Sequence, residues 1–369
     1  MKVPFFDLKE QYRQDGPSVE RVVKKVCASG HFILGPHVEA LEQRIADFCQ
    51  TKFAVGVASG SDALWLALMA LGVKPGDEVI TTSYTFIVTA TAIVKAGARP
   101  VFADVEPDGF SIDPDQVKRL ISKKTRVILP VHLFGLCAPI QELKALVRNK
   151  GIVILEDAAQ SLGARIGKDA SGSMGEAAAL SFYPTKNLGG AGDGGMVVTN
   201  DEKTARQIKI LRAHGAQKKY FHKFLGWNSR LDEIQAAILE VKLKRLKTLI
   251  QARRNVVKIY LEGLKELPLK LPKEPNNFYH TYNQFTIRTS FRDRLRSFLE
   301  KKGIGTEIYY PWPLHLQPCF SMLGYKKGNF PNAELRAQES LSLPIFPELK
   351  PSQVDFVIQT ISKFFKTEL

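Results

Sequence analysis

A lysine in a short loop is the residue whose surroundings most suggest chemistry. In the segment SFYPTKNLG, residues 181–189, Pro184 ends a predicted strand and Lys186 follows in a loop. Most lysines lie on protein surfaces, and composition alone would place this one there too. An amine withdrawn from water, however, can be neutral enough near pH 7 to act as a base. Lys186 is therefore either an ordinary surface lysine or, if it is withdrawn from water, a candidate base.

The lysine loop continues into GGAGDGG, residues 189–195, which contains five glycines. Such a run costs backbone entropy, and close packing of the backbone against a ligand or a partner subunit is one reason to keep it. The run includes a G-x-G-x-x-G match at Gly190, Gly192 and Gly195. A dinucleotide fingerprint leaves a strand and opens a helix, whereas this match precedes a predicted strand, so we set that interpretation aside.

An aspartate at the end of an apolar strand is the second candidate. In ILEDAAQS, residues 154–161, Asp157 directly follows the predicted strand. The carboxyl ends of parallel strands form the edge at which open α/β sheets bind ligands. Asp157 is therefore either a ligand-binding carboxylate or the cap of the next helix. Glu156 points to the other side of the pleat, which favours a structural role.

Two further segments begin helices. In VASGSDAL, residues 57–64, a strand ends at small residues and a helix starts at Ser61 or Asp62, where free N–H groups could hold a phosphate. An ordinary N-cap explains the same pattern. In GWNSRLDEIQAA, residues 226–237, an irregular turn enters a helix with Ser229 or Asp232 as its cap, which by itself indicates no chemistry.

Strands and helices are predicted to alternate from about Phe53 to Asn200, which would bring these segments together. Short runs rich in Val and Ile predict strands, and helical patterns lie between them. This alternation predicts an α/β fold whose large domain has a mostly parallel seven-stranded sheet between layers of helices. The predicted strands are residues 53–57, 78–82, 100–104, 126–130, 152–156, 179–182 and 195–199, and the predicted helices are residues 62–71, 85–96, 115–123 and 140–150.

The rest of the chain predicts helices followed by a smaller α+β domain. One helix is expected at residues 203–212 and one long helix at 232–264, because apolar residues recur there on one stripe. We place the domain boundary near residue 250, which gives a large domain of residues 1–250 and a C-terminal domain of residues 251–369. That second domain is expected to contain strands at 282–288 and 306–310 and helices at 292–302 and 352–365.

Composition bounds the class of protein. The chain has 369 residues, a formal net charge of +15 and a hydrophobic fraction of 44%, which permits a large core. The positive charge recurs on helical stretches rather than in one tail, and we find no nucleic-acid-binding module. Four widely spaced cysteines indicate neither a disulfide framework nor a metal site. Without a signal-peptide or membrane-span pattern, we expect a cytoplasmic protein that does not enter a membrane.

Taken together, the chain resembles the DegT/StrS family of nucleotide-sugar aminotransferases. Besides the segments above, the resemblance rests on PFFDL at 4–8, FILGP at 32–36, GDEVI at 76–80, PVHLFG at 130–135, PWPLH at 311–315 and LSLP at 341–344. These matches occur in order over nearly the whole chain. The resemblance implies the aspartate-aminotransferase type of fold, a homodimer, and pyridoxal 5'-phosphate (PLP), with pyridoxamine 5'-phosphate (PMP) as its aminated form.

The resemblance also implies roles for particular residues. Lys186 matches the lysine that carries PLP as a Schiff base, and Asp157 matches the partner of the pyridine nitrogen. Gln160 matches the residue near the ring hydroxyl, and Phe86 stands where an aromatic residue stacks on the ring. The phosphate cradle matches Gly60, Ser61 and Ser181, together with Asn228, which would reach the phosphate from the other subunit.

The expected substrates are an amino-acid donor, glutamate, and a keto sugar on a nucleoside diphosphate. The pattern around residues 187–195 resembles members that act at the 3-keto position, and the 4-keto position is the alternative. Leu162 stands where many members have His, so a sugar contact through that His is not expected. Candidate substrate residues, each with surface or packing as its alternative, are Lys219, Tyr220 and Arg230 for the nucleotide phosphates and Tyr183, Tyr310 and His315 for the sugar.

Two rival functions remain near this one. Related dehydratases carry His in place of the lysine, and Lys186 argues against that reading. A non-catalytic sensor that binds PLP or a nucleotide sugar would not need the complete set of cofactor residues, so the intact set favours an enzyme.

Overall fold

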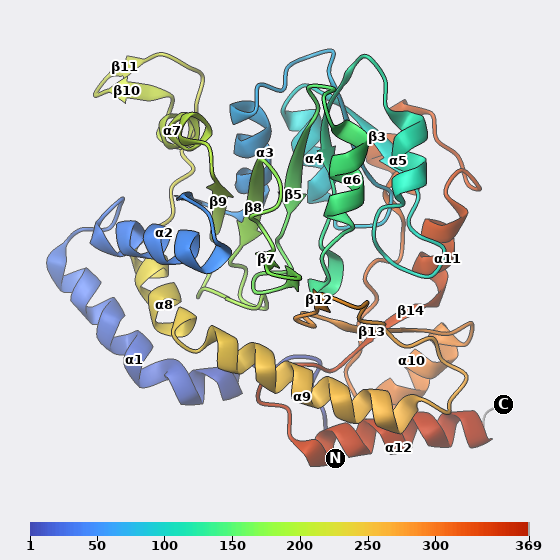
Figure 1. The fold of residues 1–369 in the computed structure, drawn as a ribbon. Helices are drawn as coiled ribbons and strands as arrows, with labels where there is room; N and C mark the ends of the chain where they lie inside the picture. Colours follow the sequence, from blue (N-terminus) through green and yellow to red (C-terminus); the bar gives the residue numbers. More distant parts are fainter. Residues whose placement is uncertain (368–369) are drawn as a thin grey trace.

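A seven-stranded sheet forms the centre of the protein (Figure 1). The structure is a computed structural model that describes residues 1–367. The strand order is β1-β9-β8-β5-β4-β2-β3, and all strands are parallel except β9, which runs antiparallel to both neighbours. The seven predicted strands are all present with ends within two residues of those expected. They are β1 Phe53–Val57, β2 Glu78–Thr82, β3 Arg99–Ala103, β4 Thr125–Leu129, β5 Val153–Asp157, β8 Ala177–Ser181 and β9 Gly195–Thr199.

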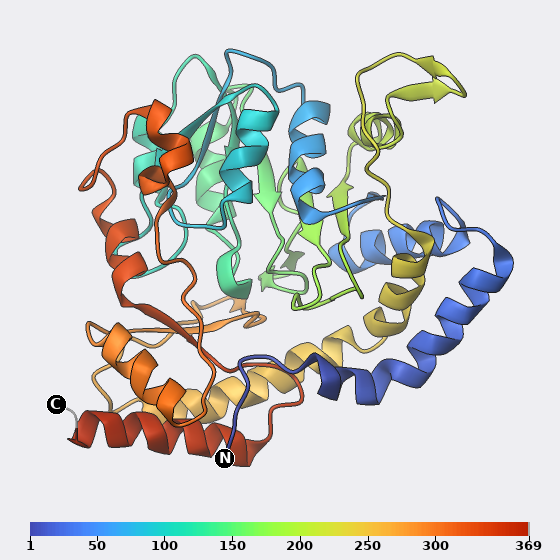
Figure 2. The same cartoon turned by 180° about the vertical axis from the view of Figure 1, so that it is seen from behind.

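Helices cover both faces of this sheet, as Figures 1 and 2 show from opposite sides. Alternate strand residues such as Val55 and Val197 face one apolar core, and Ala54 and Val198 face another. Apolar side chains on both faces explain why the strands read as continuous hydrophobic runs. The first core is closed by α3 Gly60–Ala70, α4 Val88–Lys95 and α7 Glu202–Leu211, and the second face by α2 Pro36–Cys49, α5 Pro114–Leu120, α6 Ile140–Val147 and α8 Glu233–Leu243.

The prediction of one long helix over residues 232–264 is wrong. The segment forms two helices, α8 and α9 (Leu246–Leu264), which meet at Lys244 and Arg245. The first packs on α2 and on α1 (Leu8–Ser29), whereas α9 packs on α12 (Pro351–Thr367). A single straight helix could not follow both surfaces. Arg245 also bonds to Gln14 and Asp15 of α1, which fixes the break.

A smaller core lies around α9 and α12, as predicted for a C-terminal α+β unit. Its strand β13 Phe285–Arg288 begins three residues later than the predicted strand at 282–288 and ends where expected. Residues 306–310 form only an isolated bridge from Glu307 to Ser342. The missed strand β14 Ser340–Leu343 pairs with β13 instead, and α10 (Arg292–Lys301) packs nearby. The two cores do not divide neatly at residue 250, since Val3 lies in the small core and α11 (Pro331–Glu339) packs on the large one.

Short elements complete the chain. A hairpin of β10 and β11 stands away from the body in both views (Figures 1 and 2). Among residues 1–367, no helix is long and apolar enough to cross a membrane. The remaining elements are β6 Arg165–Ile166, β7 Asp169–Ala170, β10 Ala216–Lys218, β11 Phe221–His222, β12 Phe278–Tyr279, η1 Leu133–Gly135, η2 Leu314–Leu316 and η3 Pro318–Leu323.

Candidate active site

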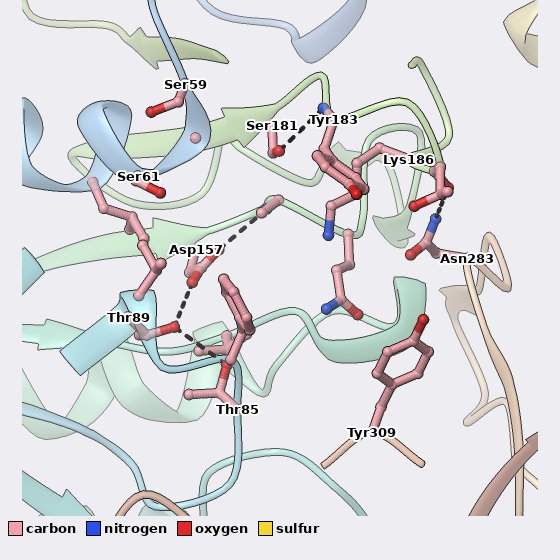
Figure 3. Close-up of a pocket in the computed structure, with 18 of the residues that line it drawn as sticks. Ser59, Ser61, Thr85, Thr89, Asp157, Ser181, Tyr183, Lys186, Asn283 and Tyr309 are labelled. Atoms are coloured by element: carbon pink, nitrogen blue, oxygen red, sulfur yellow. Dashed lines mark hydrogen bonds between the residues drawn. The ribbon is translucent and has the colours of Figure 1, made fainter. Parts of the chain in front are cut away.

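A cavity of about 550 Å³ opens at the carboxyl ends of the parallel strands (Figure 3). Strands β5 and β8 end in it at Asp157 and Ser181, because parallel strands deliver their last residues to the same edge of a sheet. The cavity brings together nine of the residues predicted from sequence, which come from segments more than 200 residues apart. They are Gly60, Ser61, Phe86, Asp157, Gln160, Ser181, Tyr183, Lys186 and Tyr310.

Lys186 lies in the loop that follows β8 and extends into the cavity, as Figure 3 shows. Its backbone N–H donates to the carbonyl of Tyr183 at 2.9 Å, so the loop after Pro184 is a tight turn. Burial lowers the pKa of Lys186 to about 8, and the negative charge of Asp157 opposes this shift. A substantial fraction of the amine is therefore neutral at pH values near 8, which a nucleophile or base requires.

Two buried asparagines form hydrogen bonds that hold the lysine loop in place. Asn283 Nδ2 donates to Asn187 Oδ1 at 3.2 Å, and Asn187 Nδ2 donates to the carbonyl of Leu162 at 3.1 Å. Both asparagines are buried. Sequence reasoning missed Asn283, because nothing near it in the chain signals a partner 96 residues earlier. Asn283 Nδ2 also donates to the Thr185 carbonyl at 3.5 Å, so these hydrogen bonds hold the residues on both sides of Lys186.

The glycine run packs against the chain's own elements. A Cβ atom at Gly195 would lie 2.3 Å from the backbone of Ser59, and one at Gly189 would lie 2.2 Å from the carbonyl oxygen of Pro184. Helix α8 holds the run by two side chains: Gln235 accepts from the Ala191 N–H at 2.8 Å, and Lys242 donates to the Gly189 carbonyl at 2.8 Å. The glycines therefore permit close backbone approach without requiring a ligand.

Asp157 is the last residue of β5, and it is buried in the wall of the cavity. Its Oδ2 accepts a hydrogen bond from Thr89 Oγ1 at 2.8 Å, and its Oδ1 accepts from the Ala159 N–H at 3.2 Å (Figure 3). Burial raises the pKa of Asp157, while the Thr89 hydrogen bond and the positive charge of Lys186 act in the opposite direction. Thr89 was not predicted from sequence, because a threonine inside a predicted helix carries no distinctive signal.

Helix α3 points its N-terminus at the cavity. It begins at Gly60, one or two residues earlier than the predicted start at Ser61 or Asp62, because Ser59 is the N-cap and accepts from the Asp62 N–H at 3.1 Å. Within residues 1–367, no acceptor takes the N–H groups of Gly60 or Ser61. A Cβ at Gly60 would lie 2.7 Å from Ser181 Cβ, so glycine lets this helix end approach β8. Free N–H groups and the positive end of a helix form an anion site.

Aromatic side chains form the opposite wall. The rings of Phe86 and Tyr310 lie 5.9 Å apart between centroids, and Tyr309 lies beside them. Gln160 Nε2 donates to the Tyr310 hydroxyl at 3.2 Å, and Gln160 Oε1 accepts from the Phe134 N–H at 2.8 Å. Burial raises the pKa of Tyr310, so this hydroxyl stays protonated. The wall offers ring faces and amide and hydroxyl groups.

Five predicted residues lie outside this cavity. Asn228 and Arg230 line a second cavity of about 260 Å³, and Asp193 lines both. Lys219 and Tyr220 lie at the tip of the hairpin, where Tyr220 is 85% exposed.

The placement of His315 at the sugar site is not supported, because its side chain is buried between Phe330 and Glu334, with Nε2 at 3.0 Å from Glu334 Oε1.

These residues fit PLP. The group needs an anion site for its phosphate, a carboxylate for its ring nitrogen, an amine for its aldehyde and an apolar contact for its ring, and the cavity has one of each. The two unused N–H groups at the start of α3 are the observation that most favours a phosphate. Residues 1–367 contain no cluster of His, Cys, Asp and Glu suited to a metal ion.

A half-buried lysine and a buried aspartate at the carboxyl edge of such a sheet are the groups that an aminotransferase of the PLP type needs. Comparison with known proteins agrees: residues 14–362 match the DegT/DnrJ/EryC1/StrS aminotransferase family, and the chain belongs to it. The predicted family, enzyme class and fold are thus confirmed.

Particular relatives match over nearly their whole length. A pleiotropic regulatory protein of Geobacillus stearothermophilus is 48% identical, with 99% of each chain covered. The dTDP-3-amino-3,4,6-trideoxy-alpha-D-glucose transaminase of Streptomyces venezuelae is 42% identical over 98% of this chain and 96% of the relative. The structure of S. venezuelae DesV in complex with a ketimine intermediate superposes with a TM-score of 0.97 at 42% identity, covering 99% of both chains.

A further solved structure bears on the cofactor. NtdA of Bacillus subtilis with bound PMP superposes with a TM-score of 0.93 at 29% identity, covering 99% of this chain and 86% of that one. This relative supports the cofactor predicted from the sequence.

Proposed function

We propose that this protein transfers an amino group from an amino acid, glutamate, to a keto sugar carried on a nucleoside diphosphate, with PLP held by Lys186. The observation that carries the proposal is the Lys186–Asp157 pair facing the N-terminus of α3 in one cavity. A sensor that binds PLP without turnover would use Lys186 only as a tether, whereas an enzyme also uses it as a base, so turnover of glutamate distinguishes the two functions. Two relatives that are named as transaminases of dTDP- and UDP-linked sugars support the sugar substrate.

Each residue has a defined task in this proposal. PLP, when bound, supplies an electron sink that stabilises negative charge at the substrate carbon. Lys186 would tether the cofactor and, once released, move a proton at its Nζ atom between two carbons. Asp157 would keep the ring nitrogen protonated, and Gln160 would meet the ring hydroxyl. The N–H groups of Gly60 and Ser61, with the hydroxyl of Ser181, would bind the phosphate, and Phe86 would cover the ring.

Cofactor loading should depend on pH with a midpoint near 8. Schiff-base formation requires neutral Lys186, and burial lowers its pKa to about 8, so the amine is protonated below this value and reactive above it. We expect the rate at which apoprotein gains the PLP visible band to rise through pH 8 and then level off. Stopped-flow absorbance at saturating PLP measures this rate. A midpoint near that of free lysine, about 10.4, would contradict the burial argument.

The keto group at C3 is the proposed acceptor position. The Streptomyces venezuelae relative is named for a 3-amino sugar, and another, from Acidithiobacillus ferrooxidans at 40% identity, for a 3-aminotransferase. A panel of 3-keto and 4-keto sugars on dTDP and UDP, incubated with holoenzyme and glutamate, tests both substrate class and position by mass spectrometry and NMR. Amination of a 4-keto sugar alone would refute the C3 proposal, and amination of neither would refute the substrate class.

The active site is proposed to be completed by a second copy of the chain. Tyr220, Phe221 and Leu225 on and beside the projecting hairpin are exposed by 85%, 61% and 85%, which is unusual for large apolar side chains in water. Lys186 is the one lysine or arginine among the described residues that line the cofactor cavity. A diphosphate substrate therefore needs positively charged side chains from elsewhere. A homodimer would bury the hairpin, and Asn228, Arg230, Lys219 and Tyr220 would then reach the partner's cavity.

Mixed dimers test this sharing. Lys186→Ala and Asn228→Ala homodimers should each be nearly inactive. When they exchange subunits, one site of each heterodimer would combine intact Lys186 with intact Asn228 of the other chain. We expect about a quarter of wild-type activity in a random equimolar mixture, because half of the dimers are heterodimers and each heterodimer has one working site out of two. Activity that stays at the level of the separate variants would show that both residues serve the same chain's site.

A further inference from the structure

Two threonines next to Asp157 form a chain of hydroxyl groups beneath the cavity. Thr89 Oγ1 lies 2.8 Å from Asp157 Oδ2, and Thr85 Oγ1 lies 3.2 Å from Thr89 Oγ1. Both threonines are buried, with 1% and 3% of their surface exposed. Figure 3 shows the three side chains in line along one side of the cavity.

The direction of these hydrogen bonds follows from the inventory of protons. An ionised carboxylate only accepts, so Thr89 donates its single hydroxyl proton to Asp157. That proton cannot also be given to Thr85, and the 3.2 Å contact therefore has Thr85 as donor and Thr89 as acceptor. Each donation polarises the next in the same direction, toward the carboxylate.

The same turn also positions the predicted ring contact. Phe86 lies between the two threonines in sequence, and the Thr89 N–H donates to the Phe86 carbonyl at 3.2 Å. The backbone turn that presents the Phe86 ring to the cavity thus also fixes Thr89 against Asp157. The turn at the start of α4 therefore holds both the Asp157 carboxylate and the Phe86 ring, which fixes their positions relative to each other.

We propose that Thr89 is a positioning residue for the amino-transfer reaction, which orients Asp157 and keeps it ionised toward the cofactor's ring nitrogen, with Thr85 orienting Thr89. This inference rests on the proposed function, because it concerns how Asp157 acts on bound PLP. The other titratable groups near Asp157 are Lys186, His132 and Tyr310. None of them bonds to Thr89, so a substitution at Thr89 leaves them in place.

Thr89→Val tests the proposal, because valine has the shape of threonine but no hydroxyl. We expect the proton shared by Asp157 and the ring nitrogen to move toward the carboxylate. In holoenzyme loaded with ¹⁵N-labelled PLP, the ring-nitrogen NMR signal should shift toward the unprotonated position at pH values where wild type stays protonated. The first half-reaction with glutamate should slow about ten-fold, the effect of losing one hydrogen bond to a charged group.

Matched variants separate this role from a structural one. Thr89→Ser keeps the hydroxyl and should restore the wild-type ¹⁵N signal. Thr91→Val makes the same change two residues along α4, where the hydroxyl bonds only to the Val88 carbonyl, and should match wild type. If Thr89→Val fails to fold, Thr85→Val decides, with a smaller shift expected in the same direction.

The outcomes show separately whether the proposed amino-transfer function or the proposed role of Thr89 is wrong. A wild-type protein that does not bind PLP defeats the proposed function. A wild-type protein that binds PLP, with Thr89→Val or Thr85→Val showing the same ¹⁵N signal as Thr91→Val across the pH range, overturns the inference alone.

Discussion

Replacing Lys186 with alanine should reduce amino transfer by about 10⁴-fold, the upper range for loss of a positioned acid–base group. The substitution removes both the amine that would tether the cofactor and the base that would move the proton. The surrounding hydrogen bonds involve the backbone of residue 186 and the side chains of Asn187 and Asn283, so the loop should keep its shape. Conversion of glutamate to its keto acid, followed in single turnover, measures the loss.

Borohydride reduction gives the same prediction a structural readout. Wild-type holoenzyme should acquire a stable PLP adduct on the peptide that contains Lys186, located by mass spectrometry, and Lys186→Ala should not. Lys186→Arg keeps the positive charge near Asp157 but cannot form the adduct, and Lys168→Ala removes an exposed lysine at a turn as a control. An adduct on another lysine, or undiminished turnover by Lys186→Ala, would contradict the assignment.

The central sheet was predictable because its strands carry their own signal. Val55, Val197 and their neighbours are apolar on both faces, and such runs are hard to place anywhere but the interior of an α/β fold. Asp157 and Ser181 were then fixed at one edge, because parallel strands end together. The convergence of Lys186 on the same edge follows from its place directly after β8. For these residues, local sequence and topology give the same answer.

Contacts between distant segments were not predictable in this way. Thr89 and Asn283 are ordinary polar residues until folding brings them to Asp157 and Asn187, 68 and 96 residues away. The break at Arg245 depends on which surface each half of the predicted helix meets. Both were missed because their cause lies in tertiary packing rather than in any local pattern.

His315 shows the limit of motif matching. It occurs in the PWPLH segment, four residues after Pro311 and close in sequence to Tyr310, which does line the cavity. A 3₁₀ turn over Leu314–Leu316 directs the imidazole away from the cavity, toward Glu334 of α11. Burial lowers the pKa of His315, and the Glu334 contact opposes that shift, which suits a packing role. His315 is thus close to Tyr310 in sequence but does not line the cofactor cavity.

Replacing Asp157 with asparagine should lower turnover by about 10²–10⁴-fold, because removing one partner of a buried charge pair costs about 3–5 kcal/mol. Asparagine has the same shape, but its one side-chain oxygen can replace only one of the two carboxylate oxygens that accept from Thr89 and from the Ala159 N–H. The negative charge that would hold the proton on the ring nitrogen is lost. Steady-state and single-turnover rates with glutamate measure this loss. Asp108→Asn, at an exposed aspartate, is the control for the chemical change itself.

Asp157→Asn should make PLP loading faster at neutral pH, although it makes turnover slower. The charge of Asp157 raises the pKa of Lys186, so its removal should lower that pKa further below about 8. The pH midpoint for PLP loading should then shift to lower pH, and Lys186 should be more reactive at neutral pH while turnover collapses. A general loss of folding would depress both measurements together. An upward shift of the loading midpoint in Asp157→Asn would show that the charge of Asp157 does not act on Lys186. Wild-type turnover in this variant would contradict the role of Asp157 toward the ring nitrogen.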